Sequence, residues 1–596
     1  MRLSRIQIKN FRNFRELDVA LAGNVVVVGE NSVGKSNLVY ALRLIFDPTM
    51  PDSARQLSLS DFWDGLDDPF AETISVAVDI TDFEGDLDVL ALVTDFRLDE
   101  DPDTVRLSYQ FRPKSGLDGD ATTPDDFEFV CHGGENEAKR FGHDLRRRIT
   151  LDVLPALRDA EGDLAAWRRS PLRPLLEDAF KTIDADDLKE IGAAVEAATK
   201  KLVEFPAVED VESKIGEHFK AMSGPRQDIK AKLGFSPSEP ARLYRNIRLL
   251  IDDGQRGIGD ASLGATNLVF LSLKALEIRA TIDANRRDHT LLAIEEPEAH
   301  LHPHLQRSVY RQLFQDEAEA GGDDLSIVLT THSPHIASVA PLRSIVLLKD
   351  AEDGGTIGRS TATLAFSEDD ADDLARYLDV TRAEMLFARG VLLVEGDAER
   401  FLVPAFAKIM ELDLDHLGIT VCSVAGTNFA PYAKFLAGLG IPFSIMTDWD
   451  PEDGKTPLGW SRAQKLVVEI ENTRTGKDQG ALVKELDAIT DPNEFSDKCE
   501  EYGVFTNVDT LEVDLFNNNL APEIIGTLRE GPFGKTRKAW IDEWEAEPKK
   551  LDRDRYLSMI ERIGKGRFAQ RLAMRLGNEE PPHYIAAAIK FVADRV

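Results

Sequence analysis

The chain opens with hydrophobic and polar residues in strict alternation and then gives way to a continuous apolar run. Residues 2–9 alternate as the strand of a half-buried sheet does, and residues 24–28 (NVVVV) form a run typical of a buried strand. A glycine-rich loop follows, after which residues from about 35 to 46 have the amphipathic period of a helix. The pattern therefore predicts a strand, a loop and a helix in that order.

The middle of the chain changes to a helical pattern with few β-branched runs. This holds from about residue 145 to 249, and we interpret residues 145–245 as a helical insertion. Strand-like runs return at 290–294, 325–329 and 345–348, and the last closes the first fold near residue 365. The first domain is thus predicted in two parts, residues 1–144 and 246–366.

An acidic segment then separates the first fold from a second one. Residues 367–389, which begin SEDDADD, are predicted to be a helical connector. A fresh apolar strand begins at residue 390, and strand and helix alternate from there to about residue 450. We assign residues 390–596 to a second α/β domain with a basic helical region at its end.

Length and composition narrow the class of protein. A chain of 596 residues is too long for one core. Its 43% hydrophobic content includes no apolar run near the ~18 residues that a membrane span needs. The first residues lack the apolar core of a signal peptide, so we expect a cytoplasmic protein without membrane contact. The three cysteines are far apart and favour neither a disulfide framework nor a zinc site.

The net charge of −34 argues against a protein that coats DNA by bulk electrostatics. Residues 529–575 reverse this sign locally, with 13 lysines and arginines against 8 acids. Such a stretch can follow a phosphate backbone, although a solvated helical surface explains the same charges. Any contact with nucleic acid is therefore expected to be local.

Residues 29–36 (GENSVGKS) fit the phosphate-binding loop pattern GxxxxGK[ST] in its required context between strand and helix. Backbone amides at the helix start would cradle phosphates, Lys35 would neutralise their oxygens, and Ser36 would hold Mg²⁺. An apolar strand 260 residues later delivers Glu295 next to the metal and Glu296 to polarise the attacking water. The next strand ends before His332, which is placed to touch the γ-phosphate.

These motifs resemble the ABC ATPase superfamily of the SMC, RecF and OLD type. The resemblance extends to residues 11–14 (FRNF), which contain Arg12, and to residues 261–266 (ASLGAT), which resemble the family's signature turn. No Q-loop glutamine is recognisable. The resemblance implies a site for ATP with Mg²⁺, and its predicted nucleotide-binding residues are Arg12, Asn31, Gly34, Lys35, Ser36, Asn37, Glu295 and Ser262, with Glu296 and His332 as catalytic groups.

Acidic residues mark two strand ends in the second domain. Glu395 follows the strand at 390–394, and Asp448 and Asp450 follow the apolar run 441–446. Alternate side chains at a strand's end point to the same side, so both aspartates can face one site. Hard oxygen ligands of this kind favour Mg²⁺ or Mn²⁺ over zinc.

Together these acids resemble the Toprim domain of topoisomerases, bacterial primases and OLD nucleases. Glu399 lies one helical turn beyond Glu395, Glu512 looks like the OLD-type "LE" acid, and residues 564–569 (GKGRFA), with Lys565, look like the C-terminal KGRFA motif. The resemblance implies a two-metal site of Glu395, Glu399, Asp448, Asp450 and Glu512. Lys565 would offset charge on the phosphate during phosphodiester hydrolysis.

An ABC ATPase followed by Toprim is the arrangement of the OLD (overcoming lysogenization defect) family, which the chain resembles over nearly its whole length. This implies an α/β protein that binds ATP and cuts DNA with divalent metals as an endonuclease or exonuclease, in phage defence or DNA repair. Some members act beside a helicase encoded next door, so a helicase is a candidate partner. ABC heads function as pairs, so a homodimer is expected, with dimerisation as one role for the insertion and packing as another.

Three other functions are compared with these motifs, and a repair ATPase is the main alternative. A RecF-like or SMC-like repair ATPase would bind DNA without cutting it, and the C-terminal acids would then be structural. A topoisomerase needs a nucleophilic tyrosine, and none of the nine tyrosines has a recognisable nucleophile context. A primase needs template-handling modules for which no segment is spare.

Overall fold

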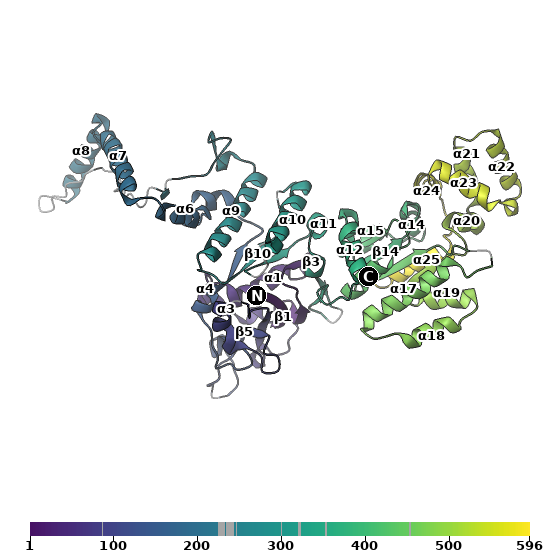
Figure 1. Cartoon of the computed structure of the whole chain (residues 1–596), viewed down its shortest axis with the longest axis horizontal. Helices are drawn as coiled ribbons and strands as arrows, with labels where there is room; N and C mark the ends of the chain where they lie inside the picture. The colour runs from purple at the N-terminus through teal and green to yellow at the C-terminus, as the bar shows by residue number, and fades with distance from the viewer. Residues whose placement is uncertain are drawn as a thin grey trace. The chain divides into compact units, whose positions relative to one another are not determined.

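A computed structural model of the chain describes all residues except 86, 118, 224–232, 234–243, 246, 300, 320–323, 352–353 and 452–453. The chain divides into two compact units, Met1–Ala156 with His289–Val596, and Leu157–Asp288. Figure 1 shows the helices and strands of both. The first unit contains the predicted second domain and most of the predicted ATPase domain, so its sheets position most of the candidate residues.

The N-terminal residues form an antiparallel sheet in the order β2-β1-β4-β5-β6. The alternation predicted for residues 2–9 is present, because every other side chain of β1 from Ile6 onward faces the core. The strands are β1 (Arg2–Phe11), β2 (Phe14–Ala20), β4 (Ile74–Thr81), β5 (Val105–Pro113) and β6 (Phe127–Gly133).

A second sheet carries the phosphate loop and has the order β13-β12-β3-β11-β10-β7. All of its pairs are parallel except that of β12 with β13. Its strands are β3 (Val25–Gly29), β7 (Ile149–Leu154), β10 (His289–Glu295), β11 (Leu325–Thr330), β12 (Ile345–Asp350) and β13 (Thr356–Ser360). Helix α1 (Lys35–Phe46) buries eight side chains and shares one hydrophobic core with both sheets.

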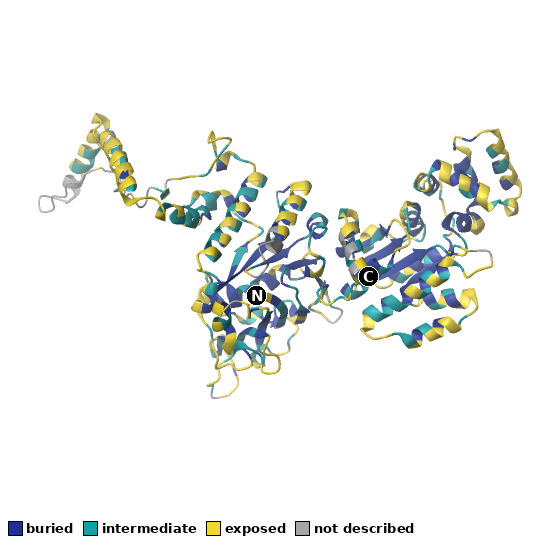
Figure 2. Ribbon diagram, in the orientation of Figure 1, coloured by how far each residue is buried: buried dark blue, intermediate teal, exposed yellow. Residues whose placement is uncertain are grey.

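The second domain is built on a four-stranded sheet in the order β15-β14-β16-β17, in which every pair is parallel. Its strands are β14 (Gly390–Val394), β15 (Ile419–Ser423), β16 (Phe443–Thr447) and β17 (Val504–Thr506). Figure 2 shows this sheet buried, which explains why β14 reads as a continuous apolar run.

Helices surround this sheet and continue into the C-terminal region. They are α14 (Asp397–Ile409), α15 (Leu414–Leu417), α16 (Ala430–Leu439), α17 (Leu458–Thr475), α18 (Gly480–Ala488), α19 (Pro492–Glu500), α20 (Leu511–Leu515), α21 (Ala521–Arg529), α22 (Lys535–Ala546), α23 (Arg553–Ile563), α24 (Lys565–Ala573) and α25 (His583–Ala593). A single hydrophobic core joins α14, α24 and α25 to strands β14 and β16. The connector contains α12 (Glu368–Tyr377), which packs against α16.

The second compact unit, Leu157–Asp288, differs from the predicted insertion at both ends. Strand β7 lies inside the segment expected to be helical, because Ile149–Leu154 pairs in parallel with β10 and extends the phosphate-loop sheet. Helix α9 (Leu263–Asp283) packs against α5 (Ala160–Ala165) and α6 (Leu172–Lys181) and so belongs to this unit. Helices α7 (Ala185–Val203) and α8 (Pro206–Ser223) complete it.

Several apolar side chains of this unit are exposed, among them Ile191 at 51% and Phe205 at 56%. The role of this unit in dimerisation stays a prediction. Among the described residues, no helix combines the length and the hydropathy that crossing a membrane requires.

Candidate nucleotide and metal sites

The loop between β3 and α1 wraps its backbone around the side chain of Lys35. The Lys35 ammonium group donates to the carbonyl oxygen of Gly29 at 3.0 Å and to that of Glu30 at 2.7 Å. Burial lowers the pKa of Lys35, while the carboxylates of Glu296 and Glu298 oppose that change. A cation inside a loop at the start of a helix is suited to phosphate oxygens.

Gly34 is required by both its conformation and its surroundings. Its φ of +91° lies in the left-handed region, and a β-carbon there would lie 2.0 Å from the Asn13 side-chain amide. Asn13 donates to the carbonyl of Val33 at 2.8 Å and accepts from Asn37 at 2.6 Å. The sequence pattern marks Gly34, whereas Asn13 is identified as its partner only by the structure.

Arg12 and Asn37, both predicted for nucleotide binding, contact each other directly. Arg12 donates to the Asn37 side-chain oxygen at 2.9 Å and forms an ion pair of 3.0 Å with Asp61. Its guanidinium group also lies 4.3 Å from the ring centroid of Tyr40. These contacts fix Arg12 beside the first turn of α1. Asn31 is exposed on the loop.

Ser36 and Glu295 come together although 259 residues separate them in the sequence. The Ser36 hydroxyl donates to the Glu295 carboxylate at 2.7 Å. Strand β11 lies between β3 and β10, so the carboxyl ends of three parallel strands bring the serine and the acid to one edge. A hydroxyl and a carboxylate in contact are the oxygen ligands that Mg²⁺ takes beside a bound nucleotide.

Glu296 and His332 also meet at this edge. Their side chains approach to 3.9 Å, between His332 Nε2 and Glu296 Oε1. Glu298, which the sequence did not single out, accepts from the His332 backbone amide at 2.6 Å and from Thr331 at 2.9 Å. Burial and then the charge of Lys35 lower the pKa of His332, which favours the neutral imidazole.

Ser262, the predicted signature residue, belongs to the other compact unit. Its hydroxyl accepts from the backbone amide of Ala265 at 3.3 Å and caps the start of α9. A serine opening a helix matches the predicted turn, and its part in nucleotide binding stays a prediction.

The acids of the second domain gather at the carboxyl edge of its sheet. Glu395 follows β14, and Asp448 and Asp450 follow β16, which is the parallel neighbour of β14 with Val394 opposite Met446. Glu395 accepts from the Thr447 hydroxyl at 2.6 Å and from the Asp448 backbone amide at 3.0 Å. Adjacent parallel strands therefore deliver these acids to one place.

Arg462 bridges two of these acids and was missed from the sequence. From α17, it donates to Glu395 at 3.0 Å with one terminal nitrogen and to Asp450 at 3.0 Å with the other. The arginine side chain is 16% exposed, and Glu395 is 18% exposed. The only sequence signal was its place in the first helix after the aspartates, and an arginine there is common enough to pass unnoticed.

Glu399 is buried and Asp448 is half-buried, and both lie among other carboxylates. Burial, followed by the charges of Glu395 and Glu399, raises the pKa of Asp448 to about 8. Burial, with Glu395 and Glu512 adding to it, raises the pKa of Glu399 to about 7. The Asp448 carboxylate accepts from the side-chain amide of Asn507 and from the Leu511 backbone at 3.0 Å. The charged forms of both acids therefore call for a further cation.

Glu512 and Lys565 form the third part of this cluster. Lys565 Nζ lies 3.2 Å from Glu512 Oε1, and the glutamate side chain is 3% exposed. The other carboxylate oxygen of Glu512 is buried without a hydrogen-bond partner among the described residues. Burial lowers the pKa of Lys565, but the charges of Glu512, Asp448 and Glu399 outweigh it and raise that pKa.

Within the described part of the chain, no three or more His, Cys, Asp or Glu side chains stand in a metal-holding arrangement. Arg462 and Lys565 instead neutralise the acids. The residues nevertheless fit a divalent cation, because their donors are hard carboxylate oxygens and Glu512 has a buried oxygen without a partner. The five-residue metal set stays a prediction.

Comparisons with known proteins agree with this architecture. Residues 386–450 match the family described as "Overcoming lysogenization defect protein-like, TOPRIM domain", and residues 1–129 and 172–337 match the family described as "AAA ATPase domain". An OLD nuclease of Thermus scotoductus is 26% identical over 511 residues, covering 82% of this chain and 90% of that protein. Endonuclease GajA of Bacillus cereus is 22% identical over 481 residues, covering 77% of each chain.

A solved structure matches the C-terminal part. The C-terminal region of the Burkholderia pseudomallei OLD protein is 42% identical in sequence, with a TM-score of 0.30, and the match covers 35% of this chain and 98% of that one. The two family matches include the phosphate loop and the strand-end acids Glu395, Asp448 and Asp450. The chain therefore belongs to the OLD family of nucleases, in which an ATPase domain precedes a Toprim domain.

Proposed function

We propose that this protein is a DNA nuclease that hydrolyses phosphodiester bonds with two divalent cations, Mg²⁺ or Mn²⁺, held by its Toprim acids, and that ATP binding in the head regulates it. The names of the relatives, OLD nuclease and endonuclease GajA, support a nuclease acting on DNA. Such an activity would serve in phage defence or in DNA repair.

The gathering of acids at one sheet edge carries the proposal. Glu395 and Asp448 follow adjacent parallel strands, and Asp448, Glu399 and Glu512 influence one another's charge. A purely structural cluster would pair each acid with a base. Here Asp448 and Glu399 keep raised pKa values, which a bound cation would lower.

The acids of the cluster and the two basic residues beside them each have a role in this proposal. Glu395, Glu399, Asp448, Asp450 and Glu512 would hold the cations. When bound, divalent cations lower the pKa of water and stabilise the oxygen that leaves phosphorus. Lys565, held beside Glu512, would offset negative charge on the phosphate. Arg462 would orient Glu395 and Asp450.

The ATPase domain, called the head above, is proposed to bind ATP with Mg²⁺. Lys35 would neutralise the phosphates, and Ser36 with Glu295 would hold the metal through the pair they already form. Glu296 would polarise water, and His332, close to it, would contact the γ-phosphate. Arg12 and Asn37 would support the loop, and Ser262 would act as the signature serine when two heads pair in a homodimer.

A plasmid assay tests the nuclease proposal. Supercoiled plasmid is incubated with the full chain and Mg²⁺ or Mn²⁺, beside Asp448→Asn, Lys35→Ala and a control variant, Asp415→Asn, at an exposed acid of the same domain. Asparagine keeps the oxygen that accepts from Asn507 and Leu511, so the fold is preserved while the charge is lost. We expect nicking or linearisation that Asp448→Asn abolishes and Asp415→Asn retains.

The alternative, a repair ATPase that binds DNA without cutting it, predicts another outcome. In that case no form cleaves the plasmid with either metal, while ATP hydrolysis is present and is lost in Lys35→Ala. Cleavage that survives Asp448→Asn unchanged would also contradict the assignment of the acids.

A further inference from the structure

A cavity of about 810 Å³ lies in the larger compact unit, away from both candidate sites. Five charged residues line it, the four arginines Arg5, Arg359, Arg474 and Arg595 and the single aspartate Asp18. In a chain of net charge −34, four guanidinium groups around one space need an explanation.

The single carboxylate cannot neutralise the other arginines. Asp18 receives the Nε hydrogen of Arg5 at 2.7 Å and the amide of Gln7 at 3.1 Å. The Arg5 hydrogen bond is the main reason that the pKa of Asp18 lies below its ordinary value. Among the described residues, none of Arg359, Arg474 and Arg595 forms an ion pair with a carboxylate, although the charge of Glu471 acts on Arg474.

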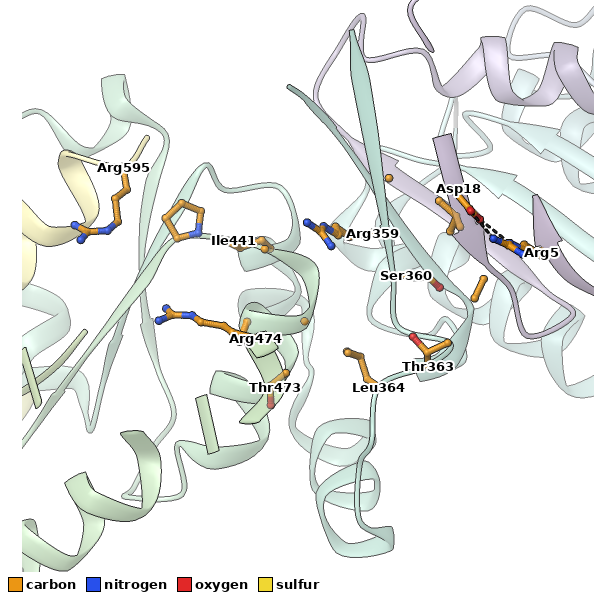
Figure 3. Close-up of a pocket in the computed structure, with 17 residues that line it drawn as sticks. Arg5, Asp18, Arg359, Ser360, Thr363, Leu364, Ile441, Thr473, Arg474 and Arg595 are labelled. Carbon is orange, nitrogen blue, oxygen red and sulfur yellow. Dashed lines mark hydrogen bonds and ion pairs between the residues drawn. The ribbon is translucent and has the colours of Figure 1, made fainter. Parts of the chain in front are cut away.

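Three separate elements supply these three arginines. Arg359 is on β13, Arg474 is in the last turn of α17, and Arg595 follows α25. Figure 3 shows Arg359 reaching across the space toward Ile441, with Arg474 and Arg595 on the facing wall. Since nothing in the local sequence requires arginine at all three places, their convergence is a property of the fold.

The facing pair is held in position by aromatic rings. The guanidinium group of Arg595 lies 3.6 Å from the Phe591 ring centroid and donates to the Phe591 carbonyl at 2.7 Å. Arg474 lies 5.6 Å from the ring of Phe443. Burial lowers the pKa of Arg474; the charge of Glu471 opposes this change, and the charge of Arg595 adds to it. Two like charges are thus held near each other, an arrangement that an anion would stabilise.

The cavity is distinct from the acid cluster. It is lined by Gly440, Ile441 and Pro442, which precede β16, whereas Asp448 and Asp450 follow that strand. The two ends of a five-residue strand are roughly 17 Å apart. Its volume lies in the range of small-molecule sites, about 300 to 1,000 Å³, rather than that of an open track for a duplex.

We propose that this cavity binds a small polyphosphate anion, such as a nucleoside triphosphate, with Arg359, Arg474 and Arg595 as its phosphate ligands. The hydroxyl groups of Ser360, Thr363 and Thr473 also line the space and supply further donors. Planar guanidinium groups bind phosphate oxygens in pairs, which favours an anion with several phosphates. This site is separate from the phosphate loop and does not depend on the nuclease proposal.

Calorimetric titration of the full chain carrying Lys35→Ala tests the site, because that substitution weakens the phosphate loop. The probes are inorganic triphosphate and ATP, both in EDTA. In that background, Arg359→Gln with Arg474→Gln is compared with a charge-matched control, Arg343→Gln with Lys484→Gln, at exposed positions. We expect the cavity pair to raise the Kd at least about tenfold and the control to change it less than about twofold.

The probes separate the sources of the anion. Tighter binding of ATP identifies a nucleotide as the ligand, and equal binding identifies the phosphates alone as sufficient. The proposal is overturned if the Lys35→Ala chain binds neither probe, or if the cavity and control variants bind equally. It is also overturned if the cavity variants lose only single-stranded oligonucleotide binding, since the arginines would then belong to a nucleic-acid surface. Thermal unfolding of every variant shows whether the fold is intact.

Discussion

Arg462 lies 3.0 Å from the carboxylate of Glu395 and donates a hydrogen bond to it. The same guanidinium group reaches Asp450 with its second terminal nitrogen, so one side chain neutralises acids from two different strand ends. A divalent cation would compete for the same oxygens. Arg462 therefore takes part in the electrostatic balance of the site whether or not metal is bound.

Replacing Arg462 with glutamine should destabilise the metal-free protein more than the metal-bound protein. Glu395 and Asp450 would lose their cationic partner in a largely buried place, which costs about 1 to 3 kcal/mol. Mg²⁺ would restore much of this loss by neutralising the same acids. Thermal unfolding in EDTA and in Mg²⁺ measures the loss of stability without metal and with metal. An equal loss in the two conditions would mean that Arg462 only packs the domain together.

Metal binding should strengthen as pH rises. The pKa values of Asp448, about 8, and of Glu399, about 7, lie above the ordinary values of 3.8 and 4.5. The folded metal-free chain therefore binds more protons than the unfolded chain, so its stability falls as pH rises from about 4 toward 8. A bound cation displaces those protons, and we expect its affinity to rise at least about fiftyfold between pH 6 and pH 8.

Calorimetric titration of Mg²⁺ at the two pH values checks this, with Asp448→Asn as the comparison. The variant lacks the main titrating group, so its metal-free stability should exceed that of the parent chain at pH 8 while its metal affinity is lower. An affinity that does not change with pH would show that the acids are already ionised before metal arrives.

Much of the fold and many of the candidate residues could be predicted from the sequence because strong local signals mark them. The β14 run from Gly390 to Val394 is apolar throughout, since both faces of its sheet are covered. The pattern of the phosphate loop fixes Lys35 and Ser36 by spacing alone. Such positions depend on backbone geometry that only a few residue types satisfy.

Residues that act through tertiary contacts could not be found in this way. Arg462, Asn507 and Glu298 reach their partners from helices and loops whose sequences carry no motif. Strand β7 was missed because its six residues follow directly on helix α4 (His143–Arg148) and pair with a strand 140 residues later. Non-local pairing of this kind overrides the local helical period.

Replacing Gly34 with alanine should abolish nucleotide binding. The added β-carbon would meet the Asn13 side chain at 2.0 Å, in a backbone conformation that side chains rarely adopt. The clash would displace Asn13 from both Val33 and Asn37 and open the loop. Equilibrium binding of a fluorescent ATP analogue measures the effect. Ser32→Ala is the control, because Ser32 already carries a β-carbon at a positive φ. Binding retained by Gly34→Ala would place the nucleotide elsewhere.

Replacing Lys565 with alanine should slow the chemical step while leaving DNA affinity nearly unchanged. The ammonium group is held 3.2 Å from Glu512, where it can offset charge developing on phosphate, and loss of one such group costs about 10²-fold in rate. Lys565→Arg keeps the charge and should retain part of the activity. Single-turnover cleavage measures the rate of the chemical step, and filter binding measures the DNA affinity. Lys550→Ala, at a half-exposed lysine of the same basic region, is the control and should affect neither strongly. If Lys565→Ala weakens binding with no change in the cleavage rate at saturation, the lysine belongs to a solvated basic helix that only attracts the DNA backbone.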